Sequence, residues 1–243
     1  MTTPLKPTLR YFDARGRAQF IRYYLRARGV EFTDERVPLS DDFSAWRSLR
    51  PDRSRTGPFQ RLPVLHWGDR LVAEALVIAE FLHTANGDAS RLSDEENLRQ
   101  RMLVSSLYAD VLTPIGILLW ADLALPGVDV AAYAPRMLER LRLYLETLDT
   151  TLTEWHWLDG IAERPVMLAD CLLWEELDLV QFLFAAHAQL DAFPALTRFY
   201  RECPGRTAFE ACLAALPCQI TGRPNEAEAI GVIRAALAGT SAA

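Results

Sequence analysis

The chain has 243 residues, of which 50% are hydrophobic and 24% are charged, and its formal net charge is −6. This composition excludes disordered, collagen-like and low-complexity proteins, and the negative charge argues against a nucleic-acid partner. The length suffices for one to two domains whose core needs no metal or disulfide. The most apolar run, Ile115 to Leu125, is interrupted by Asp122, so no membrane partner is predicted.

Two further features predict a cytoplasmic protein without a metal site. Met1–Lys6 lacks the apolar core of a secretory signal. The cysteines form no CxxC pair and no zinc spacing, and the histidines form no HExxH pair, so reduced thiols and structural histidines are expected. These residues are Cys171, Cys203, Cys212 and Cys218, with His66, His83, His156 and His187.

Charge is unevenly distributed along the chain. Residues 1–88 hold 14 basic and 11 acidic residues, a net charge of +3, whereas the remainder has a net charge of −9. Either the first third binds an anionic ligand or its charge is ordinary scatter, and the sequence leaves both interpretations open.

The first third predicts a β-α-β-α-β-β-α unit, which folds as a small mixed sheet covered by helices. Apolar alternation predicts the strands, helical spacing predicts the helices, and Gly68-Asp69 predicts a hairpin turn. The expected elements are strand Thr8–Phe12, helix Arg15–Gly29, strand Val30–Pro38, helix Asp41–Leu49 starting at Asp41 or Asp42, strands Leu62–His66 and Leu71–Ala73, and helix Glu74–Thr84.

After residue 88 the pattern is entirely helical, so the fold class is α+β. Ser93 and Glu96 have the spacing of a capping box, Pro114 should bend the first long helix, and Asp191 is a candidate N-cap. The expected helices are Ser93–Asp122, Ala131–Glu154, Leu168–Ala186, Asp191–Tyr200, Pro204–Leu216 and Glu226–Leu237.

Residue by residue, several segments resemble cytosolic glutathione transferases, most closely the sigma, pi, mu and alpha classes that use a catalytic tyrosine. The segments are Tyr11–Ala18 (YFDARGRA), Pro58–Leu65 (PFQRLPVL), Glu74–Ala79, Leu168–Asp170 and Asp191–Pro194. The resemblance implies a thioredoxin-like domain followed by an all-helical bundle, which the pattern also predicts. We expect domains at residues 1–87 and 93–220, and a tail with one helix at residues 221–243.

The resemblance implies that Tyr11 is catalytic, donating a hydrogen bond to the sulfur of glutathione, the expected cosubstrate. A free thiol has a pKa of about 8.5, so only a few per cent is thiolate at neutral pH. A donor that stabilises the anion increases the fraction of nucleophile. The alternative is that Tyr11 is a core aromatic at the end of a strand.

Further residues are implied to bind glutathione. A cis Pro63 would expose the backbone of Leu62 to the cysteinyl portion, whereas a trans Pro63 would be an ordinary turn residue. Trp46 and Arg50 align with residues that bind the glycyl carboxylate, or else belong to a surface helix. Arg17 either approaches the site or is a surface cation of its helix.

The sequence departs from the family at three positions. Ala75 replaces a serine that binds the γ-glutamyl carboxylate, although its backbone N–H at a helix start still suits that group. The neighbouring Glu74 is not a departure and suits the γ-glutamyl ammonium. Arg61 replaces a common glutamine and adds a cation. Met167 stands where a Ser/Thr helix cap is usual. These departures weaken the expectation of glutathione binding without excluding it.

The leading interpretation is an enzyme that adds the glutathione thiolate to a small hydrophobic electrophile, or uses it for isomerisation or elimination. The alternative is a non-catalytic member of the fold that binds hydrophobic ligands. The expected second-substrate pocket lies between the domains and is lined by Phe12, Asp13, Tyr108, Leu112 and Ile115.

A homodimer is also expected. Phe59 lies in a loop where several classes of the family project an aromatic side chain into the partner subunit, and an exposed aromatic would otherwise be a liability. The alternative is that Phe59 folds inward against Trp46 or Leu62.

Overall fold

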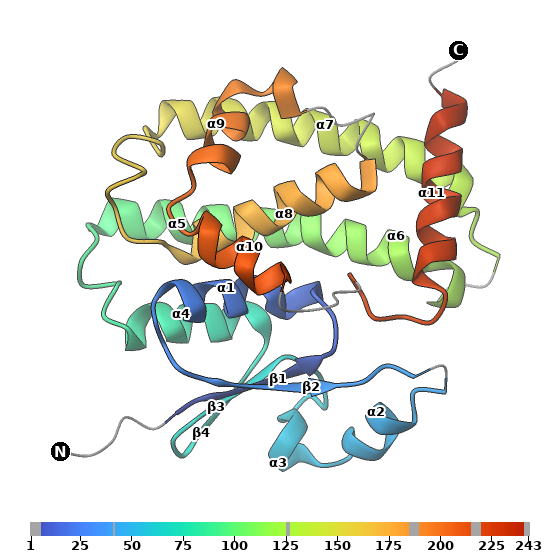
Figure 1. Ribbon diagram of the computed structural model, residues 1–243, viewed down its shortest axis with the longest axis horizontal. Coiled ribbons are helices and arrows are strands. Elements are labelled where there is room, and N and C mark those ends of the chain that lie inside the picture. Colours follow the sequence, from blue (N-terminus) through green and yellow to red (C-terminus); the bar gives the residue numbers. More distant parts are fainter. Residues whose placement is uncertain (1–5, 41, 125–126, 185–189, 215–219, 241–243) are drawn as a thin grey trace.

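The computed structural model describes residues 6–40, 42–124, 127–184, 190–214 and 220–240. Figure 1 shows a small sheet on one side of a larger helical bundle, with α1 (Gln19–Ala27) and α4 (Ala75–Ala85) between them. Cys218, His187 and Asp41 lie outside the described residues.

The first part of the chain is a thioredoxin-like domain, as predicted. Its sheet has the strand order β2-β1-β3-β4, with β1 parallel to β2 and antiparallel to β3. The strands are β1 (Thr8–Phe12), β2 (Thr33–Val37), β3 (Val64–Trp67) and β4 (Arg70–Ala73), and the remaining elements are η1 (Gly16–Ala18), α2 (Ser44–Leu49) and α3 (Arg53–Thr56).

Helix α3 was not predicted, and α2 begins later than expected. Asp52 caps α3 by accepting a hydrogen bond from the Ser54 N–H at 3.0 Å. Asp42 lies before α2 and accepts from the Ser44 N–H at 3.0 Å, so the carboxylate stabilises the start of the helix from outside it.

The second part of the chain is helical, and among the described residues no strand follows β4. The predicted capping box is confirmed, because Ser93 and Glu96 exchange hydrogen bonds at the start of the first long helix. The elements are α5 (Asp94–Leu107), η2 (Tyr108–Leu112), α6 (Thr113–Ala124), α7 (Val130–Glu154), α8 (Leu168–Phe184), η3 (Leu190–Ala192), α9 (Pro194–Glu202), α10 (Arg206–Ala214) and α11 (Glu226–Thr240).

The segment η2 is π-helical and lies directly before Pro114. The N–H of Thr113 donates to the carbonyl of Tyr108, five residues earlier. Because proline lacks an N–H and its ring crowds the carbonyl four residues before it, the wider turn accommodates Pro114 without ending the helix. The stretch Asp94–Ala121 is long and apolar enough to cross a membrane, and it packs against α7 and α8 within the helical domain.

The expectation that Asp191 caps the following helix is wrong. Asp191 lies in η3, and α9 starts at Pro194 without a side-chain cap from Phe193. Instead, the N–H of Leu196 donates to the carboxylate of Asp149 on α7 at 2.8 Å. A carboxylate distant in sequence therefore satisfies the helix start, which no local pattern reveals.

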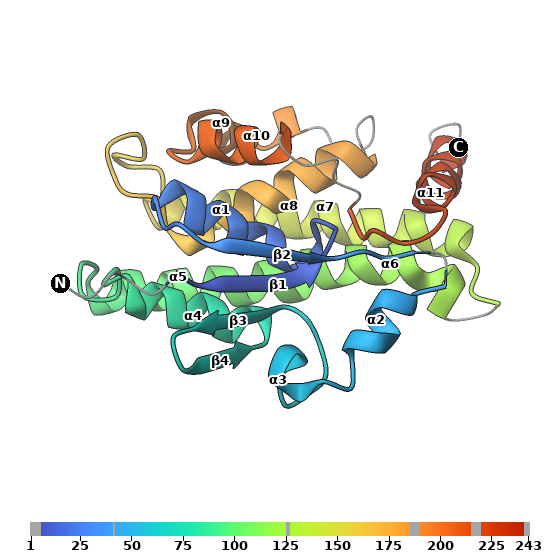
Figure 2. The same cartoon turned by 60° about the horizontal axis from the view of Figure 1, so that its bottom comes forward.

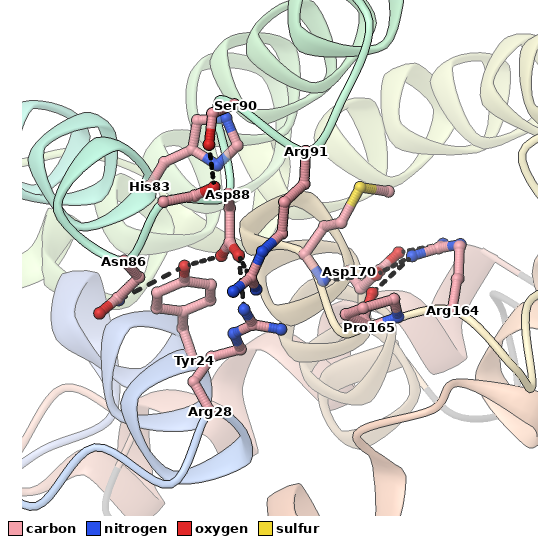
Figure 3. Close-up of polar contacts among 12 residues, drawn as sticks. Tyr24, Arg28, His83, Asn86, Asp88, Ser90, Arg91, Arg164, Pro165 and Asp170 are labelled. Atoms are coloured by element: carbon pink, nitrogen blue, oxygen red, sulfur yellow. Dashed lines mark hydrogen bonds and ion pairs between the residues drawn. The ribbon is translucent and has the colours of Figure 1, made fainter.

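A buried carboxylate joins the two domains (Figure 3). Asp88 is 8% exposed and accepts hydrogen bonds from the Tyr24 hydroxyl and the Arg28 guanidinium, both from the N-terminal domain. It also accepts from Arg91, which leads into α5, at 3.3 Å. This carboxylate therefore links α1 and the residue that follows it to the segment that leads into α5.

Asp170 binds the backbone N–H of Met167, the residue before α8, but it does not replace the hydroxyl cap that Met167 lacks. Its carboxylate is fully buried and accepts from the Met167 N–H at 2.9 Å and from Arg164 at 2.6 and 2.8 Å (Figure 3). This bond is one half of a capping box, and a hydroxyl at position 167 would supply the other half by accepting from the Asp170 N–H.

Candidate active site

Tyr11 lies on β1 beneath the loop that follows this strand. Its side chain is 8% exposed, and its hydroxyl oxygen accepts a hydrogen bond from the Arg17 N–H at 3.1 Å. Gly16 has a φ of +40°, and a Cβ there would be 2.5 Å from the Tyr11 hydroxyl. Only glycine therefore fits between the loop and the tyrosine.

The surroundings of Tyr11 act on its acidity in opposite directions. Burial raises its pKa above the usual value of 10.0, whereas the Arg17 N–H and the charges of Arg17 and Arg22 lower it. The Arg22 guanidinium lies 5.7 Å from the centre of the Tyr11 ring. The hydroxyl keeps its proton at neutral pH and is available as a donor.

Buried charges support the loop from the side of the helical domain. Arg15 donates to both carboxylate oxygens of Glu175 on α8, at 2.9 and 2.8 Å, and to Asp178 at 2.7 Å. The Tyr23 hydroxyl also donates to Glu175 at 2.9 Å. These contacts join positions 160 residues apart and hold the loop against α8.

A second arginine supports the same loop from beneath. Arg22 is fully buried and donates to the carbonyl of Ala14 at 2.7 Å and to that of Phe12 at 3.3 Å. It also pairs with Asp34 on β2 at 3.0 Å. The backbone of residues 12–14 is thus satisfied by a side chain of α1.

Arg17, Tyr108 and Glu74 lie close to Tyr11. The Arg17 guanidinium lies 5.8 Å from the centre of the Tyr108 ring, and Arg17 itself is exposed. Burial raises the pKa of Tyr108, the Arg17 charge lowers it, and Tyr11 and Glu74 raise it. Arg17 is therefore exposed at the surface and also a neighbour of both Tyr11 and Tyr108.

Two aromatic pairs follow, one within the first domain and one between the two domains. The rings of Phe12 and Trp46 lie 5.2 Å apart, edge to face, and those of Phe43 and Trp120 lie 6.2 Å apart. Trp46 is half-buried on α2, and Trp120 belongs to α6. Phe43 and Trp120 were missed in the sequence, where Trp120 was one apolar residue of a long helix.

The predicted cis bond between Leu62 and Pro63 is present. Leu62 is 8% exposed, and among the described residues it makes no backbone–backbone hydrogen bond. Its N–H and carbonyl are therefore available to another extended peptide.

Two arginines next to this segment have exposed, positively charged side chains. Arg61 is exposed and donates only to the carbonyl of Gln60, at 3.3 Å, among the described residues. Arg50 is exposed and has no ion pair within the part of the chain that the structure describes. Neither cation is neutralised by a carboxylate of the described fold.

Glu74 and Ala75 form the start of α4. Glu74 is exposed and has a φ of +71°, and Ala75 is 2% exposed. The amide groups of the first turn of α4 follow directly, and such groups favour an anion.

Three residues expected in the second-substrate pocket differ in exposure from Phe12 and Tyr108. Asp13 is exposed and pairs with Arg36 at 2.8 Å. Leu112 and Ile115 are 5% and 2% exposed and belong to the main core. A lining role for these three residues stays a prediction.

Comparison with known proteins agrees with this arrangement. Residues 7–84 match the model of the glutathione S-transferase N-terminal domain. The chain is 26% identical to chicken hematopoietic prostaglandin D synthase over 207 residues, which are 81% of this chain and 96% of that protein. It is 30% identical to the Plasmodium falciparum glutathione S-transferase over 105 residues, but this match spans 43% of the chain and 44% of that protein.

Solved structures show the same fold. The structure of rat hPGDS complexed with a quinoline superimposes with a TM-score of 0.69 at 23% identity. The superposition covers 88% of this chain and 99% of that chain. The Onchocerca volvulus Pi-class glutathione S-transferase gives 0.66 at 21% identity, with 90% and 100% coverage. Residues 7–84 therefore match the glutathione S-transferase N-terminal domain, and the chain as a whole has the fold of these solved structures.

Within the glutathione S-transferase fold, Phe59 is strongly exposed. Its exposed fraction is 62%, so the alternative that it folds inward against Trp46 or Leu62 is wrong for the single chain.

Sequence reasoning missed the buried partners of the loop that follows β1. Glu175 and Asp178 were visible as two of the four carboxylates in a largely apolar helix, and buried carboxylates require cations. That signal predicts a partner but does not name Arg15. Among the described residues, no group of three or more His, Cys, Asp or Glu side chains is arranged to hold a metal ion.

Proposed function

We propose that this protein is a glutathione transferase in which Tyr11 donates a hydrogen bond to the sulfur of glutathione and so stabilises the thiolate. The observation that carries the proposal is the Tyr11 hydroxyl, buried at the end of β1 and oriented by the Arg17 N–H at 3.1 Å. An oriented donor next to the sulfur raises the fraction of thiolate, which is the nucleophile.

The surroundings of Tyr11 suit the rest of the tripeptide. The free backbone groups of Leu62 match the cysteinyl residue of glutathione. The unpaired Arg50 and Arg61 match the carboxylates of the tripeptide. Trp46 and Arg17 complete the pocket, Glu74 suits the γ-glutamyl ammonium, and the amide of Ala75 suits the γ-glutamyl carboxylate.

The second substrate is a small hydrophobic electrophile that binds between the domains. Phe12, Tyr108 and the aromatic pair Phe43–Trp120 supply an apolar surface there. The prostaglandin D synthase relatives support isomerisation as one use of the thiolate, and the transferase relatives support addition. Conjugation of such compounds in the cytoplasm would be a detoxifying activity.

The test combines binding and turnover. Wild-type protein should bind immobilised glutathione and conjugate it to 1-chloro-2,4-dinitrobenzene. Tyr11→Phe should lower turnover by about 10–1000-fold, as expected for the loss of one donor to a developing anion, while glutathione affinity stays nearly constant. Tyr133→Phe, an exposed tyrosine on α7, is the control.

Equal turnover of Tyr11→Phe and wild type would refute the role of Tyr11. A wild-type protein that retains apolar ligands but neither binds nor conjugates glutathione would instead support the alternative, a hydrophobic-ligand binding protein. Ala75 and Arg61 favour this alternative, because one removes a hydroxyl and the other adds a cation in the glutathione site.

We also propose a two-fold dimer in which Phe59 inserts into the partner's helical domain. The 62% exposure of Phe59 and the opposite net charges of the two parts of the chain support this arrangement. Light scattering should report twice the chain mass of 27.4 kDa, and Phe59→Ser should shift it toward the monomer. A wild-type monomer at micromolar concentration would refute the dimer.

A further inference from the structure

Residues 220–226, which we call the carboxyl-terminal strap, contact the loop that orients Tyr11. The Ile220 carbonyl accepts a hydrogen bond from the Gly16 N–H at 2.9 Å. Gly222 packs so closely that a Cβ there would lie 3.1 Å from the Asp13 carbonyl oxygen. In Figure 2 the strap leads from beside the end of β1 into α11.

A buried carboxylate holds the strap in this shape. Glu226, the first residue of α11, is 8% exposed. Its carboxylate accepts from the N–H groups of Ile220 and Thr221, both at 2.7 Å, and of Gly222 at 3.1 Å. The Thr221 hydroxyl donates to it as well. Three consecutive amides of the strap therefore depend on one side chain.

The strap is also attached to the helical domain. Arg223 is 3% exposed, and its guanidinium donates to the Leu119 carbonyl on α6 and to the Pro224 carbonyl. The strap thus connects α6 and α11 to the loop after β1.

Gly16 is the point where this connection reaches Tyr11. Its N–H bonds to the strap, and the next N–H along the chain, that of Arg17, bonds to the Tyr11 hydroxyl. Glycine has wide conformational freedom, so a φ of +40° persists only where contacts fix the neighbouring peptide groups. The hydrogen bond from the Gly16 N–H to the Ile220 carbonyl is such a contact.

We propose that Glu226 is a positioning residue for thiol activation: through the strap it holds Gly16 so that the Arg17 N–H is directed at the Tyr11 hydroxyl. The inference rests on the proposed function. Without the strap, Gly16 rotates and the Arg17 N–H leaves the hydroxyl, which then becomes a weaker donor to the glutathione sulfur.

The experiment compares Glu226→Ala with Glu228→Ala, an exposed glutamate of the same helix turn, and with Glu226→Gln, which keeps an acceptor oxygen. The readouts are the pH profile of kcat/KM with 1-chloro-2,4-dinitrobenzene and the ultraviolet absorbance of glutathione thiolate on the protein. Glu226→Ala should move the acidic limb upward by about half a pH unit or more, the loss of one hydrogen bond to a titrating pair. Glu226→Gln should restore part of this shift, and Glu228→Ala should resemble wild type.

A double-variant cycle shows whether Glu226 acts through Tyr11. In the Tyr11→Phe background, Glu226→Ala should cause no further shift of the acidic limb, because the group that it orients is gone. An equal shift in both backgrounds would overturn the inference. So would a uniform loss of activity at every pH, since that reports only a smaller folded fraction.

The two proposals fail in different ways. If Tyr11→Phe leaves turnover unchanged, the proposed function fails. If Tyr11→Phe lowers turnover but Glu226→Ala keeps the wild-type pH profile, only the inference fails.

If the Glu226→Ala variant does not fold, Gly222→Ala provides a second test, because its Cβ displaces the strap from Asp13 and leaves Glu226 in place. It should cause the same upward shift, and an unshifted profile would refute the inference.

Discussion

The loop after β1 and the rim formed by Arg50, Arg61 and Glu74 are both rich in charge, but they differ in what neutralises that charge. In the loop, Arg15 is buried and pairs with Glu175 and Asp178. On the rim, the three side chains are exposed, and no ion pair neutralises them among the described residues.

This difference separates structural charge from charge that is available to a ligand. A buried cation whose hydrogen bonds are all satisfied by the protein supports the fold and has nothing left for a small molecule. An exposed and unpaired cation contributes little to stability but can bind a carboxylate. Variants in the loop should therefore change stability, and variants on the rim should change binding.

The largest effect is expected from breaking the buried pair. Arg15→Met leaves Glu175 buried without its cation and should lower the free energy of unfolding by about 3–5 kcal/mol. Urea denaturation followed by far-ultraviolet circular dichroism measures this loss. Arg198→Met, which removes an exposed pair with Glu202, should cost less than about 1 kcal/mol. Similar losses for both variants would contradict the comparison.

Glu176 sharpens the comparison, because it is buried beside Glu175 but neither of its carboxylate oxygens has a hydrogen-bond partner among the described residues. Burial and the charge of Glu175 raise its pKa well above 4.5, although Arg15 lowers it. A raised pKa in the folded state means that wild-type stability falls as the pH rises above about 4.5, where the unfolded chain ionises.

Glu176→Leu should therefore stabilise the protein by about 1–3 kcal/mol at pH 8 and by less at pH 4. Thermal unfolding at both pH values measures the difference. Glu176→Gln, which cannot ionise but keeps a buried polar group, should reduce the pH dependence alone. A gain from Glu176→Leu that is the same at both pH values would show that the carboxyl does not titrate in this way.

On the rim, Arg50→Ala should weaken glutathione binding by about 1.5 kcal/mol, or roughly tenfold, and leave the free energy of unfolding within about 0.5 kcal/mol. Calorimetric titration and urea denaturation measure the two quantities. Arg53→Ala, another exposed arginine nearby, is the matched control and should bind glutathione like wild type. Equal weakening by both variants would indicate a general effect of charge instead of a carboxylate contact.

The smallest effect is expected at Ala75. Ala75→Ser introduces the hydroxyl that the family usually has and should tighten glutathione binding by up to about 1 kcal/mol. Calorimetric titration against wild type tests this expectation, with Ala75→Gly as a variant that adds no donor. Unchanged or weaker binding by Ala75→Ser would mean that the γ-glutamyl carboxylate is seated elsewhere.

Local features of this protein could be predicted from sequence because they depend on neighbours within a few residues. Strand Thr8–Phe12, the capping box of Ser93 and Glu96, and the helices of the second part follow from periodicity and from side chains that reach their own backbone. The cis Pro63 was found through the same kind of short motif, compared with a family, and the role of Tyr11 stays a prediction from that comparison.

Only the tertiary structure determined which distant groups meet. Arg15 and Glu175 are 160 positions apart, the Leu196 amide is capped by Asp149, and the Gly16 amide by Ile220. A buried charge or amide requires a hydrogen-bond or ion-pair partner, so the sequence determines that such a partner must be present. Which partner meets it depends on how α8, α7 and the strap pack against the first domain, and that packing has no local signature.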